Sequence, residues 1–277
     1  MVKHDEGFFS AKDNLRLFWE SDVPDNPRAH LAVVHGYADH SGRYRTFIDA
    51  LVAQGLAVHA FDYRGHGQAD GRRGYCESFS QYLDDLEAFW KRVREASAGK
   101  KAFLFGHSHG GLMAIHFLNR NSVNLSGLVL SAPYLKLAFQ PPPLKVFAAK
   151  LIEKVIPWLP IKTDLRPELL TRDLEAQKAV ERDHLYNRTA TPRWFNEANA
   201  AQLEAIGMAK SLRTPTFVLC GSSDPIASSK TAREFFDLIG SPDKQFKEYP
   251  GMRHEPFNEV GKEEVWKDVA SWISKHL

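Results

Sequence analysis

Cysteine is scarce in this sequence of 277 residues, which contains only Cys76 and Cys220. These two residues are far apart and show none of the paired spacing that zinc sites use. A chain with so few cysteines also lacks the disulfide framework that is common in small secreted domains. We therefore expect two free thiols and no metal site.

An excess of charge of one sign is also missing, because 36 Lys and Arg residues stand against 34 Asp and Glu residues, giving a net charge of +2. This balance excludes the strongly basic surface of most nucleic-acid-binding proteins. The longest uncharged stretch, residues 102–119, contains three His and three Gly, so we expect no membrane-spanning helix. Asp5 and Glu6 lie where a signal peptide needs apolar residues. A cytoplasmic location, peripheral at membranes at most, is the expectation.

Short apolar runs alternate with segments of helical periodicity over much of the chain. This alternation predicts an α/β fold with a mostly parallel central sheet and helices on both faces. Residues 8–10 and 15–19 flank a Lys-Asp-Asn turn and predict an antiparallel hairpin. Strands are expected at 31–34, 58–61, 102–105, 128–130, 216–220 and 245–249, and helices from about 43, 79, 109, 228 and 258.

The alternation stops between about residues 135 and 210, where prolines interrupt the chain and no central strand is recognisable. We expect a helical cap over residues 135–210, inserted between two parts of a catalytic core, 1–134 and 211–277. Apolar residues from Leu144 to Val155 recur at helical spacing, and Pro157 ends the run. This stripe predicts either packing of the cap on the core or a surface that makes transient contact with a membrane or micelle.

The strongest chemical signal is Gly106-His107-Ser108-His109-Gly110, between a predicted strand and a predicted helix. A serine on such a tight strand-to-helix turn has small residues two positions away on each side, because the backbone approaches itself closely there. The turn exposes the serine hydroxyl above the strand ends. Ser108 is therefore the predicted nucleophile.

A serine hydroxyl needs a base, and the base needs an acid that fixes its tautomer. In this type of site the chain order is Ser, acid, His. Asp224 follows the predicted strand 216–220, and His254 follows the strand 245–249, so both reach the same rim. We predict Asp224 as the acid and His254 as the base. Asp237 or Asp243, and more distantly His276, are the alternatives.

Acyl transfer also needs two backbone N–H donors for the developing oxyanion. One comes from the residue after the nucleophile, His109. The other comes from the loop after an early strand, where His35-Gly36 folds the chain back and places Tyr37. Asp62, Arg64 and His66 lie in a second glycine-rich turn before the serine, and we interpret them as groups that organise this loop.

Five segments together resemble the monoacylglycerol lipase and lysophospholipase branch of the α/β-hydrolase superfamily: HGYADHSGRY (35–44), FDYRGHGQADG (61–71), GHSHGG (106–111), GSSDP (221–225) and the His254 loop. The resemblance implies hydrolysis of glycerol mono-esters or related lipids beneath a helical cap, without a cofactor. It also implies that Arg43 and His107 lie near the alcohol part of the ester; hydrogen bonding within the scaffold is the alternative role for both.

The chain departs from the family at three places. Tyr37 replaces a commonly small residue, His109 replaces a methionine, and Asp183-His184-Leu185 replaces Asp-Pro-Leu. The first two changes leave the backbone donors intact but alter the bulk near the acyl group.

Two other functions remain open from the sequence. An aminopeptidase on the same scaffold would use cap carboxylates, for which Glu168, Glu175, Glu181 and Asp183 are the candidates. A ligand-binding protein that keeps a triad-like pocket without catalysis is the second alternative. A small lipid ester is the expected partner, and the oligomeric state does not follow from the sequence.

Overall fold

An eight-stranded sheet forms the centre of the computed structural model, which describes residues 1–277 apart from the side chain of Lys145. The strand order is β1-β2-β4-β3-β5-β6-β9-β10. The strands are β1 (Val2–Ser10), β2 (Arg16–Pro24), β3 (Ala29–Val34), β4 (Leu56–Asp62), β5 (Ala102–His107), β6 (Gly127–Ser131), β9 (Thr216–Gly221) and β10 (Lys244–Tyr249). From β4 to β10 all pairs are parallel, whereas β1–β2 and β2–β4 are antiparallel. The predicted fold class and hairpin are thus confirmed.

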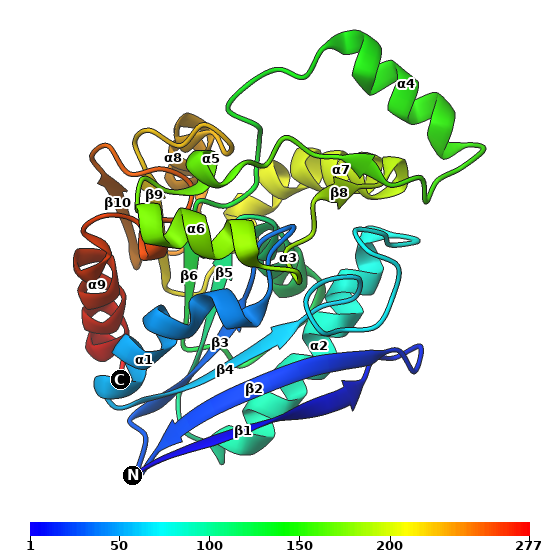
Figure 1. Cartoon of the computed structure of the whole chain (residues 1–277). Helices are drawn as coiled ribbons and strands as arrows, with labels where there is room; N and C mark the ends of the chain where they lie inside the picture. Colours follow the sequence, from blue (N-terminus) through cyan, green and yellow to red (C-terminus); the bar gives the residue numbers. More distant parts are fainter.

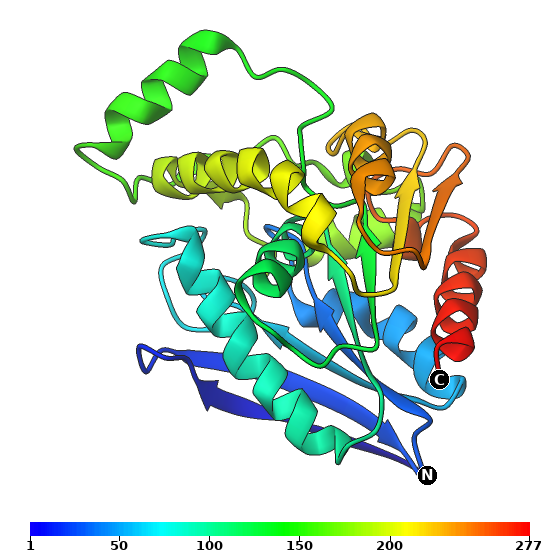
Figure 2. The same cartoon turned by 180° about the vertical axis from the view of Figure 1, so that it is seen from behind.

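Helices cover both faces of the sheet (Figures 1 and 2). On one face lie α1 (Arg45–Ala53) and α9 (Lys262–Lys275); on the other lie α2 (Phe79–Ser97), α3 (His109–Arg120) and α8 (Ser229–Leu238). Successive residues of a strand point to opposite faces, so Leu104 packs in the core with α2 and α3, and Phe103 and Phe105 pack in the core with α1 and α9. The core therefore consists of two apolar layers separated by a sheet whose central strands are completely buried.

Two predicted helix starts differ from the structure. A 3-10 turn at Ser41–Tyr44 precedes α1, and a second 3-10 turn at Pro256–Asn258 precedes α9, which begins only at Lys262. The reason at α9 is Gly261, whose φ of +83° is left-handed and breaks the helical path.

The carboxyl ends of the parallel strands meet at one rim. The register aligns Val34 of β3 with Gly106 of β5, and Gly221 of β9 with Tyr249 of β10. The loops that follow these strands therefore lie side by side, although they come from distant parts of the chain.

The chain between β6 and β9 contains α4 (Pro143–Glu153), α5 (Pro167–Leu170), α6 (Leu174–Arg182) and α7 (Pro192–Met208). It also contains β7 (Ile161–Lys162) and β8 (Thr189–Ala190), which pair with each other and do not join the central sheet. In Figures 1 and 2, α7 lies across α3, and α4 projects away from the rest of the molecule. Among the described residues, no helix combines the length and the apolar character needed to cross a bilayer.

Candidate active site

Ser108 stands on a strained turn between β5 and α3. Its backbone has φ +51° and ψ −116°, a conformation that costs a residue with a side chain about 1–3 kcal/mol. Three backbone hydrogen bonds hold it there. Its N–H donates to the Ser131 carbonyl at 2.9 Å, and its own carbonyl accepts from the N–H groups of Leu112 and Tyr134.

The glycines on both sides of Ser108 are required by close backbone approach. A Cβ on Gly106 would lie 2.6 Å from the Gly110 oxygen, and a Cβ on Gly110 would lie 2.4 Å from the Val34 oxygen. Contacts below 3.0 Å with backbone atoms cannot be relieved by moving a flexible side chain. Gly106 is therefore required by the close return of the first turn of α3, and Gly110 by packing of the elbow against the end of β3.

A chain of hydrogen bonds connects the three residues predicted for the triad. The Ser108 Oγ lies 2.9 Å from His254 Nε2, and His254 Nδ1 lies 2.8 Å from Asp224 Oδ2. A carboxylate can only accept, so His254 carries its proton on Nδ1 and leaves Nε2 free to accept from the serine hydroxyl. All three side chains are almost completely buried.

The carboxylate of Asp224 is fixed from its other side as well. Its Oδ1 accepts from the backbone N–H groups of Ile226 and Ala227 at 2.8 and 3.0 Å. The second oxygen is thereby directed toward the imidazole. The alternative acids and the alternative base are paired elsewhere. Asp243 pairs with His276 at 3.0 Å, and Asp237 pairs with Arg233 at 3.4 Å.

The charge of His254 depends on opposing effects. Burial disfavours the imidazolium, but the neighbouring Asp224 carboxylate and the more distant Glu255 and Asp39 favour it, and the pKa of His254 is raised above its ordinary value. The surroundings of His254 thus favour its protonated form, which a general base needs when it takes a proton.

The two predicted oxyanion donors lie on either side of Ser108. The N–H of His109 is the first of α3, where a helix offers no internal acceptor. The Gly36 carbonyl accepts from the Tyr63 hydroxyl and from His35 Nδ1, both at 2.8 Å. Because the peptide is planar and trans, fixing this carbonyl directs the Tyr37 N–H the opposite way. A Cβ on Gly36 would lie 3.3 Å from the Ser108 Cβ, so this peptide borders Ser108.

Comparison with known proteins places this site in a family. The model described as "Serine aminopeptidase, S33" matches residues 25–261. A monoacylglycerol lipase from Mycolicibacterium smegmatis is 30% identical over 274 residues, 98% of either chain. The chain belongs to the monoacylglycerol lipase-like branch of the α/β-hydrolase superfamily.

Two further similar proteins are a phospholipase and a second monoacylglycerol lipase. A phospholipase from Bacillus subtilis is 28% identical and covers 91% of this chain and 98% of its own. The crystal structure of a monoacylglycerol lipase from Paleococcus ferrophilus is 27% identical, with a TM-score of 0.82 and complete coverage of both chains.

Arg43 is engaged within the scaffold of this family member. Its guanidinium donates two hydrogen bonds to Glu255, at 2.9 and 2.8 Å, and one to Asp39 at 2.9 Å. The arginine thereby ties the loop after β3 to the residue that follows His254. Of the two roles considered for Arg43, this geometry favours hydrogen bonding within the scaffold.

His107 packs beside the catalytic rim. Its ring lies 4.8 Å from that of His254, and its Nδ1 donates to the Ser131 carbonyl at 3.1 Å. Burial, and then the neighbouring His254, lower the pKa of His107 well below the ordinary value. His107 is therefore a neutral side chain adjacent to the predicted base.

The carboxylates between β6 and β9 that were considered for an ammonium-binding role do not converge. Glu168 pairs with Arg166, and Glu175 pairs with Lys178, both on exposed surface. Asp183 lies 2.7 Å from His40 Nε2. Their arrangement does not favour an aminopeptidase.

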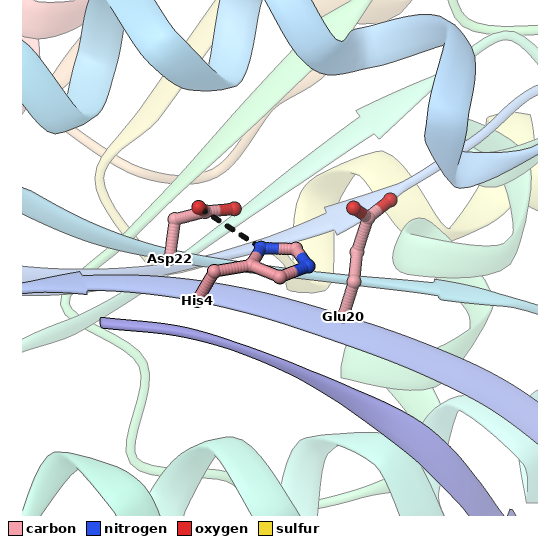
Figure 3. Close-up of side chains that lie close together, drawn as sticks. All are labelled: His4, Glu20 and Asp22. Atoms are coloured by element: carbon pink, nitrogen blue, oxygen red, sulfur yellow. Dashed lines mark hydrogen bonds and ion pairs between the residues drawn. The ribbon is translucent and has the colours of Figure 1, made fainter. Parts of the chain in front are cut away.

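His4, Glu20 and Asp22 form the group of side chains that could hold a metal ion (Figure 3). A cation is already present, because Arg45 Nη1 lies 2.7 Å from Asp22 and 3.7 Å from Glu20. The hydrogen bond with Asp22 raises the pKa of His4, which favours an imidazolium that cannot bind a metal. We interpret this group as an ion-pair cluster that joins β1, β2 and α1.

Sequence reasoning missed the residues that support the site. Glu255 follows the predicted base, but its pairing with Arg43 joins positions 212 residues apart. Asp39 also pairs with Arg43, four residues along the chain. Tyr63, which holds the Gly36 carbonyl, is a buried aromatic among many others. Only Asp39, as a charged residue within HGYADHSGRY, offered a signal.

Proposed function

We propose that this protein hydrolyses the acyl ester of monoacylglycerol-like lipids through an acyl-enzyme on Ser108. The hydrogen-bonded series Ser108–His254–Asp224 on the elbow is the observation that carries the proposal. In the first step His254 Nε2 accepts the hydroxyl proton while Oγ attacks the ester carbonyl carbon. The N–H groups of Tyr37 and His109 stabilise the oxyanion, and Asp224 stabilises the imidazolium.

The intermediate then breaks its bond to the alcohol oxygen, which takes the proton from His254. The released alcohol leaves an ester between the acyl group and Ser108. Water repeats the sequence: His254 removes one of its protons, the hydroxide oxygen attacks the acyl carbon, and Ser108 leaves with the proton. One ester and one water thus give one fatty acid and one alcohol.

The substrate class rests on the relatives and on the charge of the site. The relatives include monoacylglycerol lipases and a phospholipase. The charge of Arg43, a buried cation paired with the residue that follows His254, is already balanced by two carboxylates, so it is poorly suited to hold a phosphate as well. This favours an uncharged glycerol headgroup over a lysophospholipid.

The test compares wild type with Ser108→Ala. We expect the variant to lose at least about a thousandfold in activity and to resist labelling by a fluorophosphonate. Wild type should prefer a monoacylglycerol to a lysophospholipid of equal chain length and should not cleave aminoacyl nitroanilides. Near-full activity of Ser108→Ala would refute the role of Ser108, and preference for the nitroanilide would favour the aminopeptidase.

We further propose that residues 135–210 act as a cap and that α4 contacts lipid. Leu144, Phe147, Leu151 and Val155 are 77, 59, 49 and 75% exposed. Another side of α4, with Val146, Lys150 and Glu153, lines a groove shared with α7, and there Glu153 pairs with Arg193 at 2.9 Å. This orientation supports the lipid-contact interpretation of the stripe over packing on the core. The cytoplasmic location, with transient contact at membranes, stays a prediction that cell fractionation can check.

A further inference from the structure

Trp194 of α7 contacts both residues that supply the proposed oxyanion donors. Its indole ring stacks on Tyr37 with centroids 3.6 Å apart. Its Nε1–H donates to His109 Nε2 at 3.3 Å. Indole N–H is only a donor, so His109 must carry its own proton on Nδ1. One buried ring of the cap thereby touches both sides of the proposed oxyanion hole.

The position of Trp194 is itself fixed by the start of α7. Thr191 caps the helix, accepting from the Trp194 N–H, and Pro192 occupies the first turn, where its fixed φ suits a helix. The Thr191 hydroxyl also donates to the Gly74 carbonyl at 2.8 Å. The first turn of α7 is therefore anchored to the core.

The chain before α7 follows the oxyanion loop closely. The Tyr37 hydroxyl donates to the Thr189 carbonyl at 2.8 Å, and the Asn187 N–H donates to the Ala38 carbonyl at 2.8 Å. The loop that carries one oxyanion donor is thus bonded to the cap as well as to the core.

We propose that Trp194 is a positioning residue for the oxyanion hole. This inference rests on the proposed function. Stacking restrains the Tyr37 side chain, and the hydrogen bond restrains the His109 side chain. The backbone N–H groups of these two residues are thereby held at a fixed distance and orientation relative to each other. An oxyanion hole depends on such fixed placement, because its donors must meet the tetrahedral oxygen without reorganising. The cap then serves the chemical step in addition to covering the site.

The experiment compares Trp194→Leu with Phe195→Leu, a matched change at the next position of α7. The Phe195 side chain lines the groove beside α4 and, among the described residues, makes no ring-to-ring contact with Tyr37 or His109. Both variants are assayed with soluble p-nitrophenyl butyrate and with butylboronic acid, which forms a tetrahedral adduct on a serine oxygen. The melting temperature of each variant measures the stability that both lose when an aromatic ring is replaced by leucine.

For Trp194→Leu we expect kcat to fall about tenfold to a hundredfold, since misplacement near 1 Å can cost about a hundredfold. The affinity for butylboronic acid should fall by the same factor, while KM changes less than about threefold, because only transition-state contacts are lost. Phe195→Leu should lose stability but keep kcat and boronate affinity. Trp194→Phe keeps a ring over Tyr37 without the N–H, and we expect about a threefold to tenfold loss.

The proposal is overturned if folded Trp194→Leu matches Phe195→Leu in kcat and boronate affinity. If Trp194→Leu does not fold, Trp194→Phe provides the test. A kcat and a butylboronic acid affinity equal to those of the wild type would then overturn the proposal. Failure of the proposed function can be distinguished from failure of the proposal for Trp194. It would appear as wild-type protein that is inactive, or as activity that survives Ser108→Ala.

Discussion

Asp224→Asn tests the proposed triad at its most constrained hydrogen bond. The wild-type carboxylate accepts from two backbone N–H groups through one oxygen and from His254 through the other. In the variant, the amide oxygen keeps the two N–H donors. Turning the amide over would leave those donors facing an NH₂ group, at a cost of about 1–3 kcal/mol each. The NH₂ group must therefore face His254.

This orientation imposes the wrong tautomer on His254. Nδ1 has to accept from the amide, so the imidazole proton moves to Nε2, which can no longer take the proton of Ser108. We expect kcat to fall about ten-thousandfold, the loss known for this change in serine protease triads. Removal of the carboxylate also removes the main influence that raises the pKa of His254, so the acidic limb of the rate profile should move to lower pH.

The assay is hydrolysis of p-nitrophenyl butyrate between pH 5 and 9, together with the melting temperature. The melting temperature should change little, because both backbone donors stay satisfied. Asp243→Asn is the matched control, since Asp243 pairs with His276 at the surface and should leave kcat unchanged. Retention of a tenth or more of the wild-type kcat in Asp224→Asn would refute the tautomer argument.

Three further outcomes are expected. Arg43→Lys cannot keep the bidentate pair with Glu255 and should lower the free energy of unfolding in urea by about 1–3 kcal/mol; an unchanged value would contradict the structural role. Burial works against the charges of His40 and Asp183, but their hydrogen bond raises the pKa of His40 and lowers that of Asp183 to about 2. The raised His40 pKa contributes stability below about pH 6.5 that is lost as pH rises through the folded-state value, and Asp183 contributes above about pH 4. Asp183→Asn should therefore lower the melting temperature more at pH 5.5 than at pH 9, and an equal loss would refute the pairing. Phe147→Ser with Leu151→Ser should weaken binding to phosphatidylcholine vesicles and lower the ratio of long-chain monoacylglycerol to butyrate ester activity; an unchanged ratio with a lower melting temperature would reject lipid contact.

Local pattern predicted most of the sheet and the order of its elements. The strand predicted at 102–105 is β5, at 102–107, and the helix expected at 79 begins there. These strands can be recognised in the sequence because a buried parallel strand forms a continuous apolar run. The proposed triad could be placed for a related reason, since the carboxyl ends of parallel strands meet at one rim.

Contacts between distant positions could not be predicted in this way. The stripe on α4 shows that one side of the helix is apolar, but not whether protein or solvent covers it. The roles of Arg43 and Trp194 depend on Glu255 and His109, residues far from them in the chain. No short-range spacing encodes such pairs.

The order of the site residues along the chain has a consequence for synthesis. Ser108 precedes His254 by 146 residues, which a ribosome adds in about 7–30 s. Until His254 is added, the growing chain holds the proposed nucleophile without its base, and until Asp224 is added it lacks the acid as well. Because the last third of the protein must dock before the serine can be activated, an unfinished chain cannot hydrolyse lipid.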